Sequence, residues 1–229
     1  MKVSFWFVAI AALFVTCLIT ANIIAVKFIL LLGFLVPAGI IVFPLSYLFG
    51  DILTEVYGYA ATRRVIWLGF FCNALAVLAF TIGGIAPGAP FWHDQSAYNT
   101  ILGYVPRLLL GSFVAYLVGE FTNSFVLARL KIATKGRWLW TRTIGSTVVG
   151  EGLDTVIFIL IAFSGTIPAS AMLQAILTQW IFKVAYEVLA TPLTYWVVGF
   201  LKRKEQLDTY DYRTNFSPIL LRRMSTERD

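Results

Sequence analysis

Charged residues are scarce in this chain of 229 amino acids. They make up 13% of the sequence, about half the share in soluble domains, whereas 59% of the residues are hydrophobic. The mean hydropathy is +0.80. A compact soluble protein of this length would need more polar surface to cover its core. The scarcity of charge therefore excludes an ordinary soluble domain and indicates a polytopic membrane protein.

Histidine and cysteine are almost missing. Because His93 is the only histidine, neither a histidine metal cluster nor a Ser-His-Asp triad can form deep in the membrane. Cys17 and Cys72 both fall inside apolar runs, which argues against a disulfide framework. No Walker loop, G-x-G-x-x-G or G-x-S-x-G motif occurs. We therefore expect that the protein is not an enzyme and that it has no metal site and no cofactor.

The hydrophobic residues gather into long runs. About 20 residues cross a hydrocarbon core of ~30 Å, and six runs reach that length. We expect an all-α protein with six transmembrane helices near residues 4–26, 30–57, 64–86, 104–129, 143–165 and 171–201. The second and sixth runs exceed a perpendicular span, which favours tilt, kinks or a re-entrant part. The candidate kink sites are Pro37, Gly39, Pro44 and Pro192.

Lysine and arginine are unevenly distributed between the loops. They follow the second run, crowd the connection between the fourth and fifth runs and open the C-terminal tail. By the positive-inside rule, both termini are then cytoplasmic. We expect a six-helix membrane domain over residues 1–202 in the cell membrane and a cytoplasmic tail over 203–229.

The net charge of +6 mainly reflects this topology. The tail is too short for a domain and mixes both signs of charge, so we interpret it as a tether near anionic lipid headgroups. A nucleic-acid-binding protein would carry a basic soluble module, and none is present in the sequence. We therefore expect no nucleic-acid partner.

Six of the 12 acidic residues lie inside the apolar runs. An ionised side chain at the centre of a lone helix costs about 2.5–3.5 kcal/mol, so these acids must face one another, a cation or a wet cavity. Helical spacing arranges them in stripes with other polar residues. We therefore predict a polar site for a substrate or an ion within the membrane. Its candidate residues are Tyr47, Asp51 and Glu55 in the second run, Tyr116, Glu120 and Asn123 in the fourth, Glu151 and Asp154 in the fifth, and Gln179, Lys183 and Glu187 in the sixth.

Three of these runs share a local pattern. SYLFGD (46–51), AYLVGE (115–120) and STVVGE (146–151) each place a glycine directly before an acid. The glycine lets another helix approach closely where the acid points inward, and the recurrence hints at an internal repeat. Lys183 precedes Glu187 by one turn, which is the weaker order for such a pair. We therefore expect an acid on another helix to be the partner of Lys183.

Three long segments carry a family likeness. FPLSYLFGDILTEVYGYAATRRVIWLGF (43–70), FWHDQSAYNTILGYVPRLLLGSFVAYLVGEFTNSFVLARLK (91–131) and GRWLWTRTIGSTVVGEGLDTVIFILIAFSG (136–165) closely resemble the VUT family of membrane proteins, the queuosine precursor transporters. The resemblance covers most of residues 20–200 and leaves out the tail. It implies uptake of queuosine precursors, namely cyano- or aminomethyl-deazaguanine or queuine, across the cell membrane.

The candidate residues suit a ligand of this kind. A guanine-like ring presents adjacent N–H donors, which one carboxylate accepts in a bidentate way. Its flat faces stack on aromatic rings, a contact worth about 1–3 kcal/mol per base, and Tyr47 and Tyr116 are nearby rings. Asn, Gln or Lys can donate to the ring carbonyl. An aminomethyl group would add a cation for a second carboxylate.

Three interpretations remain open. The first is a stand-alone secondary transporter that alternates access, with a proton or ion coupled through a crowded carboxylate. The second is the substrate-binding subunit of an energy-coupling-factor-type vitamin importer, for which Ala21-x-x-x-Ala25 offers a small-residue face. The third and weakest is an ion channel or an intramembrane enzyme. A homodimer is compatible with each of them.

Overall fold

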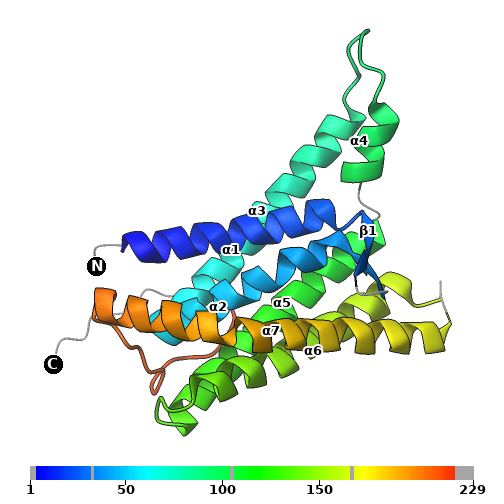
Figure 1. Ribbon diagram of the computed structural model, residues 1–229. Coiled ribbons are helices and arrows are strands. Elements are labelled where there is room, and N and C mark those ends of the chain that lie inside the picture. The colour runs from blue at the N-terminus through cyan, green and yellow to red at the C-terminus, as the bar shows by residue number, and fades with distance from the viewer. Residues whose placement is uncertain (1–3, 32–33, 104–105, 166–167, 220–229) are drawn as a thin grey trace.

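The computed structural model describes residues 4–31, 34–103, 106–165 and 168–219 (Figure 1). Within these ranges six helices are long and apolar enough to cross a membrane, which confirms the predicted fold class. Five of these spans lie in α1 (Phe5–Ile24), α3 (Tyr59–Ile85), α5 (Pro106–Ala133), α6 (Leu139–Phe163) and α7 (Ala169–Glu205). The remaining span, Ala38–Tyr57, consists of α2 (Phe43–Tyr57) and the short 3₁₀ segment before it. A short helix, α4 (Gln95–Leu102), follows α3.

The second predicted span is interrupted at its start. Residues expected to be helical from position 30 instead form an antiparallel hairpin of β1 (Phe28–Leu31) and β2 (Phe34–Pro37), followed by a 3₁₀ turn (Ala38–Ile41). The α-helix begins only at Phe43, with Pro44 in its first turn. Proline fits there because backbone N–H groups in the first turn of a helix have no acceptor within the helix, so its lack of an N–H costs no hydrogen bond. Pro44 therefore marks the start of α2 rather than a kink within it.

Helix α7 is much longer than a perpendicular span requires. Its 37 residues correspond to about 56 Å at 1.5 Å per residue. Pro192 lies inside it, at the predicted position. The hydroxyl groups of Thr191 and Thr194 donate to the carbonyl oxygens of Glu187 and Ala190, at 2.8 and 3.2 Å. The helix thus passes through the proline and continues to the basic residues that close it.

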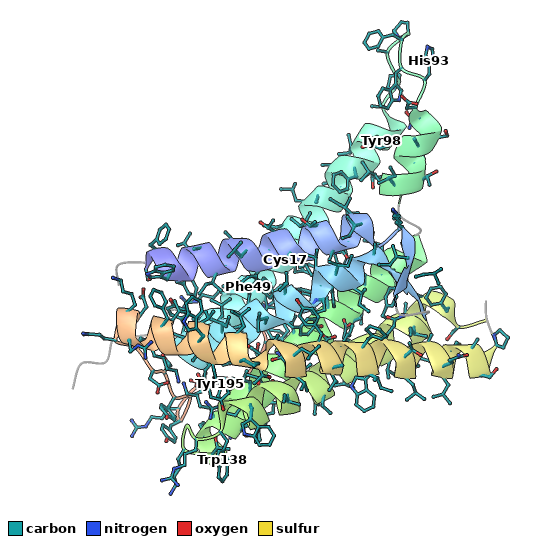
Figure 2. The ribbon with its side chains drawn as sticks, viewed as in Figure 1. Cys17, Phe49, His93, Tyr98, Trp138 and Tyr195 are labelled. Carbon is teal, nitrogen blue, oxygen red and sulfur yellow. The ribbon has the colours of Figure 1, made fainter. Side chains whose placement is uncertain are left out.

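Five of the long helices run side by side, and α3 crosses them and projects beyond them together with α4 (Figure 1). Helix α2 contacts α1, α5 and α7, and α6 packs between α5 and α7. Figure 2 shows His93 at the projecting tip and Tyr98 on α4 below it. Because most residues of α2 are buried, this helix forms the centre of the bundle.

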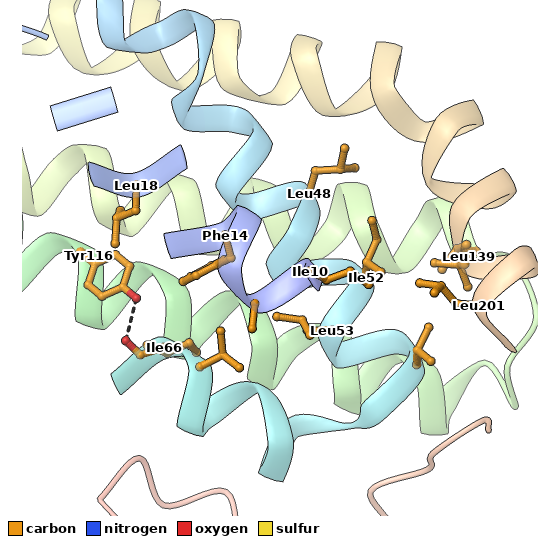
Figure 3. Packing of buried hydrophobic residues seen from close by; sticks show 14 residues of the cluster. Ile10, Phe14, Leu18, Leu48, Ile52, Leu53, Ile66, Tyr116, Leu139 and Leu201 are labelled. Atoms are coloured by element: carbon orange, nitrogen blue, oxygen red, sulfur yellow. Dashed lines mark hydrogen bonds between the residues drawn. The ribbon is translucent and has the colours of Figure 1, made fainter. Parts of the chain in front are cut away.

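An apolar core joins α1, α2, α3 and α5. Phe14 and Leu18 of α1, Leu53 of α2 and Ile66 of α3 are at most 1% exposed (Figure 3). Tyr116 of α5 completes the core and donates from its hydroxyl to the carbonyl oxygen of Ile66 at 2.8 Å. Lipid tails are as apolar as leucine, so this core holds the helices by close packing rather than by exclusion of water.

The start of α1 and the end of α7 lie at the same end of the bundle (Figure 1). The hydroxyl of Ser4, before α1, donates to Oε1 of Glu205, at the end of α7, at 2.6 Å. The connection between α5 and α6, with Lys135 and Arg137, lies at this end as well. We call it the basic end. Its assignment to the cytoplasmic side stays a prediction from the loop charges.

The described part of the C-terminal tail, residues 207–219, packs across the basic end. The side chain of Asp211 accepts a hydrogen bond from the backbone N–H of Tyr59 at 3.0 Å. Nη1 of Arg63 donates to the carbonyl oxygens of Asn215 and Ser217, at 2.9 and 2.6 Å. This part of the tail is docked on the helices, a contact that its sequence did not predict, and its position near lipid headgroups stays a prediction.

Candidate substrate-binding site

Helices α5 and α6 cross closely where their glycine-acid patterns meet. A β-carbon added at Gly119 would lie 2.8 Å from Cβ of Asp154 and 3.3 Å from the carbonyl oxygen of Gly150. A side chain at this position would therefore push the two helices apart. Glu120 and Glu151, the acids that follow the two glycines, are at most 1% exposed. The predicted combination of a close helix approach and a buried acid is confirmed at this crossing.

One lysine of α7 pairs with two acids of α6. Nζ of Lys183 lies 2.6 Å from a carboxylate oxygen of Glu151 and 2.6 Å from one of Asp154. The expectation that Lys183 pairs with an acid on another helix is thus confirmed. The same ammonium lies 4.9 Å from the centre of the Phe43 ring, at the start of α2. This lysine therefore connects α7 to both α6 and α2.

Asp51 of α2 and Asn123 of α5 form a buried pair. Nδ2 of Asn123 donates to Oδ1 of Asp51 at 2.6 Å, and neither residue is exposed. One turn further along α2, the hydroxyl of Thr54 lies 3.2 Å from that of Ser124. In the described part of the chain, Oδ2 of Asp51 and Oδ1 of Asn123 have no hydrogen-bond partner. Each residue of the pair thus keeps one free acceptor.

Glu120 is the least satisfied acid of the bundle. It is fully buried, and neither of its carboxylate oxygens has a hydrogen-bond partner among the described residues. The hydroxyl of Tyr47, 1% exposed on α2, is unpaired within the same ranges. Glu120 interacts electrostatically with Glu151 and Asp154 as well as with Lys183. Polar atoms left unpaired at such depth are costly unless a ligand, an ion or water meets them.

Glu187 of α7 joins the same group of acids. It is 2% exposed and lies one turn beyond Lys183. It interacts electrostatically with Asp51 of α2 and with Glu151 of α6. We define the acid cluster as five carboxyl groups and one lysine: Asp51, Glu120, Glu151, Asp154, Glu187 and Lys183.

Glu55 belongs to a different environment from the acid cluster. Its carboxylate lies 2.9 Å from Arg142, 2.6 Å from Lys202 and 3.5 Å from Lys131. These cations lie at the basic end of α6, α7 and α5. Because its oxygens are already engaged, Glu55 has little capacity left for a substrate in this conformation. The structure thus separates Glu55 from Asp51, although both lie on one stripe of α2.

The acid cluster does not include two further candidate residues, Tyr116 and Gln179. Tyr116 is packed in the apolar core, with its hydroxyl bonded to Ile66. Gln179 is half-buried on α7. Its neighbour Trp180 donates from Nε1 to the carbonyl oxygen of Val148 at 2.9 Å, which anchors α7 on α6.

The cations that pair with Glu55 are not apparent as its partners in the sequence. Arg142, Lys131 and Lys202 lie near loops, where they indicate topology, yet Arg142 and Lys131 are 1% exposed. The available signal was Glu55 itself, because a buried acid needs a cation close by. The basic residues nearest to it in depth were those at the ends of α5, α6 and α7. Composition alone cannot distinguish a basic residue that only indicates topology from one that pairs with a buried acid.

The chain was compared with known proteins. Residues 37–197 match the family model described as "putative vitamin uptake transporter". A "probable queuosine precursor transporter" of Bacillus subtilis is 33% identical over 180 residues, which cover 77% of this chain and 78% of that protein. The "queuosine precursor transporter" of Escherichia coli is 26% identical over 193 residues, 82% of each chain. No solved structure gives a significant match.

These findings agree with the fold. Six apolar helices and transporter relatives show a multi-pass membrane protein that transports rather than catalyses. They lend no support to the alternative of a substrate-binding subunit of an energy-coupling-factor-type importer. The resemblance noted in the sequence is confirmed, because the family match spans most of the helical bundle. The chain belongs to the vitamin uptake transporter family.

Proposed function

We propose that this transporter imports queuosine precursors, cyano- or aminomethyl-deazaguanine or queuine, and binds the base at the acid cluster. One observation carries the proposal: four helices bring five buried carboxyl groups together around a single lysine. Hydrogen bonds from serine, threonine or asparagine can hold helices together without burying a charge. Intramembrane acids in this number mark a substrate or ion pathway. The names of the relatives supply the class of substrate.

The free polar atoms of the cluster match the edges of a deazaguanine ring. A carboxylate with two free oxygens, such as Glu120, can accept from adjacent N–H groups. Asn123 can donate to a ring carbonyl if the base displaces Asp51 as its partner. Tyr47 offers a ring and an unpaired hydroxyl in the same place. The full set of candidate contacts remains Tyr47, Asp51, Glu55, Tyr116, Glu120, Asn123, Glu151, Asp154, Gln179, Lys183 and Glu187.

The balance of charge in the cluster supports coupling to a cation. Five acids face one lysine, so four negative charges would remain if every carboxyl were ionised. Like charges this close cannot all stay ionised in a buried site. Protons, another cation or the ammonium of an aminomethyl group would offset the excess. We therefore propose that uptake is coupled to a proton or a cation.

Binding is tested first with purified protein. The thermal midpoint is measured with aminomethyl-deazaguanine, cyano-deazaguanine, queuine and guanine, because a ligand that binds only the folded state raises it. We expect one or more deazaguanines to raise the midpoint of the wild type. Asp154→Asn should weaken this shift. The control Asp94→Asn makes the same chemical change at an exposed site outside the bundle.

Transport is tested with the protein alone in liposomes. Uptake of a radiolabelled precursor without any ATPase is the expected result for a secondary transporter. An inward proton gradient should accelerate it if the proton is the coupling ion. Binding without transport would contradict the stand-alone mechanism, whereas the absence of binding by every deazaguanine would contradict the substrate class.

A further inference from the structure

Glu55 ties together the four helices that form the acid cluster. Nε and Nη2 of Arg142, from α6, donate to its two carboxylate oxygens at 3.1 and 2.9 Å. Nζ of Lys202, from α7, donates to Oε1 at 2.6 Å. Nζ of Lys131, from α5, donates to the Glu55 backbone carbonyl at 2.5 Å. We call Glu55, Lys131, Arg142 and Lys202 the ionic hub.

Residues 207–219, which we call the strap, contribute a second acid to this hub. Oδ1 of Asp208 lies 2.6 Å from Nζ of Lys131 and 2.9 Å from Nζ of Lys202. Nζ of Lys131 also donates to the carbonyl oxygen of Thr209 at 2.7 Å. Two of the three cations, Lys131 and Lys202, are thus shared between Glu55 of the bundle and the start of the strap. Removing the strap would leave Lys131 with fewer acceptors.

The strap is seated on the turn between α2 and α3. The backbone N–H of Thr209 donates to the carbonyl oxygen of Val56, the last turn of α2, at 3.3 Å. Gly58 occupies that turn with a φ of 82°, which favours glycine. A β-carbon there would lie 2.7 Å from Cγ2 of Thr209. The strap can approach this closely only because residue 58 has no side chain.

The far half of the strap is held by aromatic contacts. The ring of Phe216 lies 5.0 Å from that of Tyr59 and 5.1 Å from that of Phe125, measured between centroids. The guanidinium of Arg129 lies 4.8 Å from the Phe216 ring centre. The hydroxyl of Tyr59 donates to the carbonyl oxygen of Phe216 at 2.9 Å. The strap therefore connects the end of α7 with α3 and α5.

The hub lies between the acid cluster and the basic end. Glu55 follows Asp51 by one turn of α2, about 6 Å closer to that end. Glu55, Lys131 and Arg142 are at most 1% exposed. A substrate that leaves the cluster toward the basic end must therefore pass the level of the hub, which is closed in this structure.

We propose that the hub and the strap together form the gate at the basic end, and that release of the strap opens it. Asp208 and Lys202 are the members that reach water, with side chains 43% and 23% exposed. Water can therefore compete for the contact between Asp208 and Lys202 before it competes for the buried pair of Glu55 and Arg142. The strap thus holds the gate closed, and it contacts the hub through the carboxylate of Asp208 and the backbone carbonyl of Thr209.

A single reporter cysteine tests the gate without any substrate. Cys17 and Cys72 are replaced by alanine, and Thr147→Cys is introduced. Thr147 is 2% exposed on α6, between Arg142 of the hub and Glu151 of the cluster. The rate of labelling by a water-soluble maleimide is measured on the purified full-length protein. We expect Asp208→Asn to raise this rate about two- to fivefold, the range for loss of a part-exposed ion pair.

Two further variants and a second reporter distinguish opening of the gate from a general loosening of the helix bundle. Phe216→Ala removes a different anchor of the strap without changing any charge of the hub, and it should also raise the rate. The control Asp94→Asn should leave the rate unchanged. A second reporter is Ala162→Cys. Ala162 is 5% exposed and lies toward the far end of α6, so a cysteine there should be labelled equally slowly in all proteins. No increase at Thr147→Cys in either strap variant, or an equal increase at Ala162→Cys or in Asp94→Asn, overturns the proposal.

Discussion

The amino group of Lys183 lies 2.6 Å from the carboxylate of Asp154 and joins α7 to α6 across the acid cluster. The same lysine pairs with Glu151, so it is the fixed cation of the cluster in the described part of the chain. Removing one partner of a buried ion pair leaves the other charge uncompensated.

Lys183→Met should destabilise the protein by about 3–5 kcal/mol, because Glu151 and Asp154 would both lose their counter-charge. The measurement is thermal unfolding in detergent. The control Lys27→Met removes an exposed lysine from the connection after α1 and should change the midpoint little. Equal midpoints for the two variants would show that the Lys183 pairs contribute nothing to stability.

Gly119→Ala should separate α5 and α6. Its new methyl group would lie 2.8 Å from Cβ of Asp154, so we expect a loss of about 1–3 kcal/mol from overpacking and weaker binding of the base. Gly199→Ala is the matched control, because an added β-carbon there meets no atom within 4 Å. Alanine favours the helix at that position by up to about 1 kcal/mol. Opposite signs for the two changes in melting temperature would support the close crossing.

Exchanging Asp51 and Asn123 tests whether they act as a pair. Asp51→Asn replaces the acceptor of a hydrogen bond 2.6 Å long, and Asn123→Asp places two acids in contact. Each single variant should bind the base more weakly than the wild type. The double variant restores one acid and one amide and should recover part of the affinity. Additive losses in the double variant would mean that the residues act independently.

The contact between the strap and the hub should depend on pH through Asp208. Partial burial alone would raise the pKa of Asp208, but hydrogen bonds from Lys131 and Lys202, with their charges, hold this pKa below its usual value. A lowered pKa in the folded state stabilises the protein above the unfolded-state pKa, about 3.9 for aspartate. This contribution is lost as the pH falls from there through the folded-state pKa.

The corresponding measurement compares the wild type with Asp208→Asn. We expect the wild type to melt at the higher temperature at pH 7, and the difference to shrink below about pH 4 as Asp208 takes up a proton. A difference that persists unchanged at pH 3 would mean that the aspartate stabilises through its shape rather than its charge.

Glu55→Gln should be more damaging than the loss of Asp208. Lys131, Arg142 and Lys202 would then face one another with only the part-exposed Asp208 to balance them. We expect a destabilisation of about 3–5 kcal/mol, typical of a broken buried pair. Glu205→Gln removes an acid at the same end of the bundle that is only part-buried, and it serves as the control in thermal unfolding.

The sequence was most informative where a single helix determines the outcome. Apolar runs predicted the six spans, and the order of Lys183 and Glu187 correctly suggested a partner on another helix. The glycine before each acid indicated the close approach found at Gly119 and Gly150. These signals are local, so one sequence is enough to reveal them.

The sequence was least informative where the outcome depends on which helices become neighbours. Asp51 and Glu55 look equivalent on one stripe, and only the packing of α6 and α7 gives Glu55 its cations. The hairpin before α2 is apolar throughout, so hydropathy could not separate it from the helix that follows. The docking of the strap could not be predicted because it depends on a turn at Gly58, far away in the sequence.

Helix α2 carries Asp51 of the acid cluster and Glu55 of the ionic hub one turn apart. A rigid helix cannot shift one of these residues without the other. A ligand that favours one position of α2 by its contact with Asp51 must therefore change the stability of the hub. By thermodynamic reciprocity, loosening the hub must change the affinity for that ligand by the same factor.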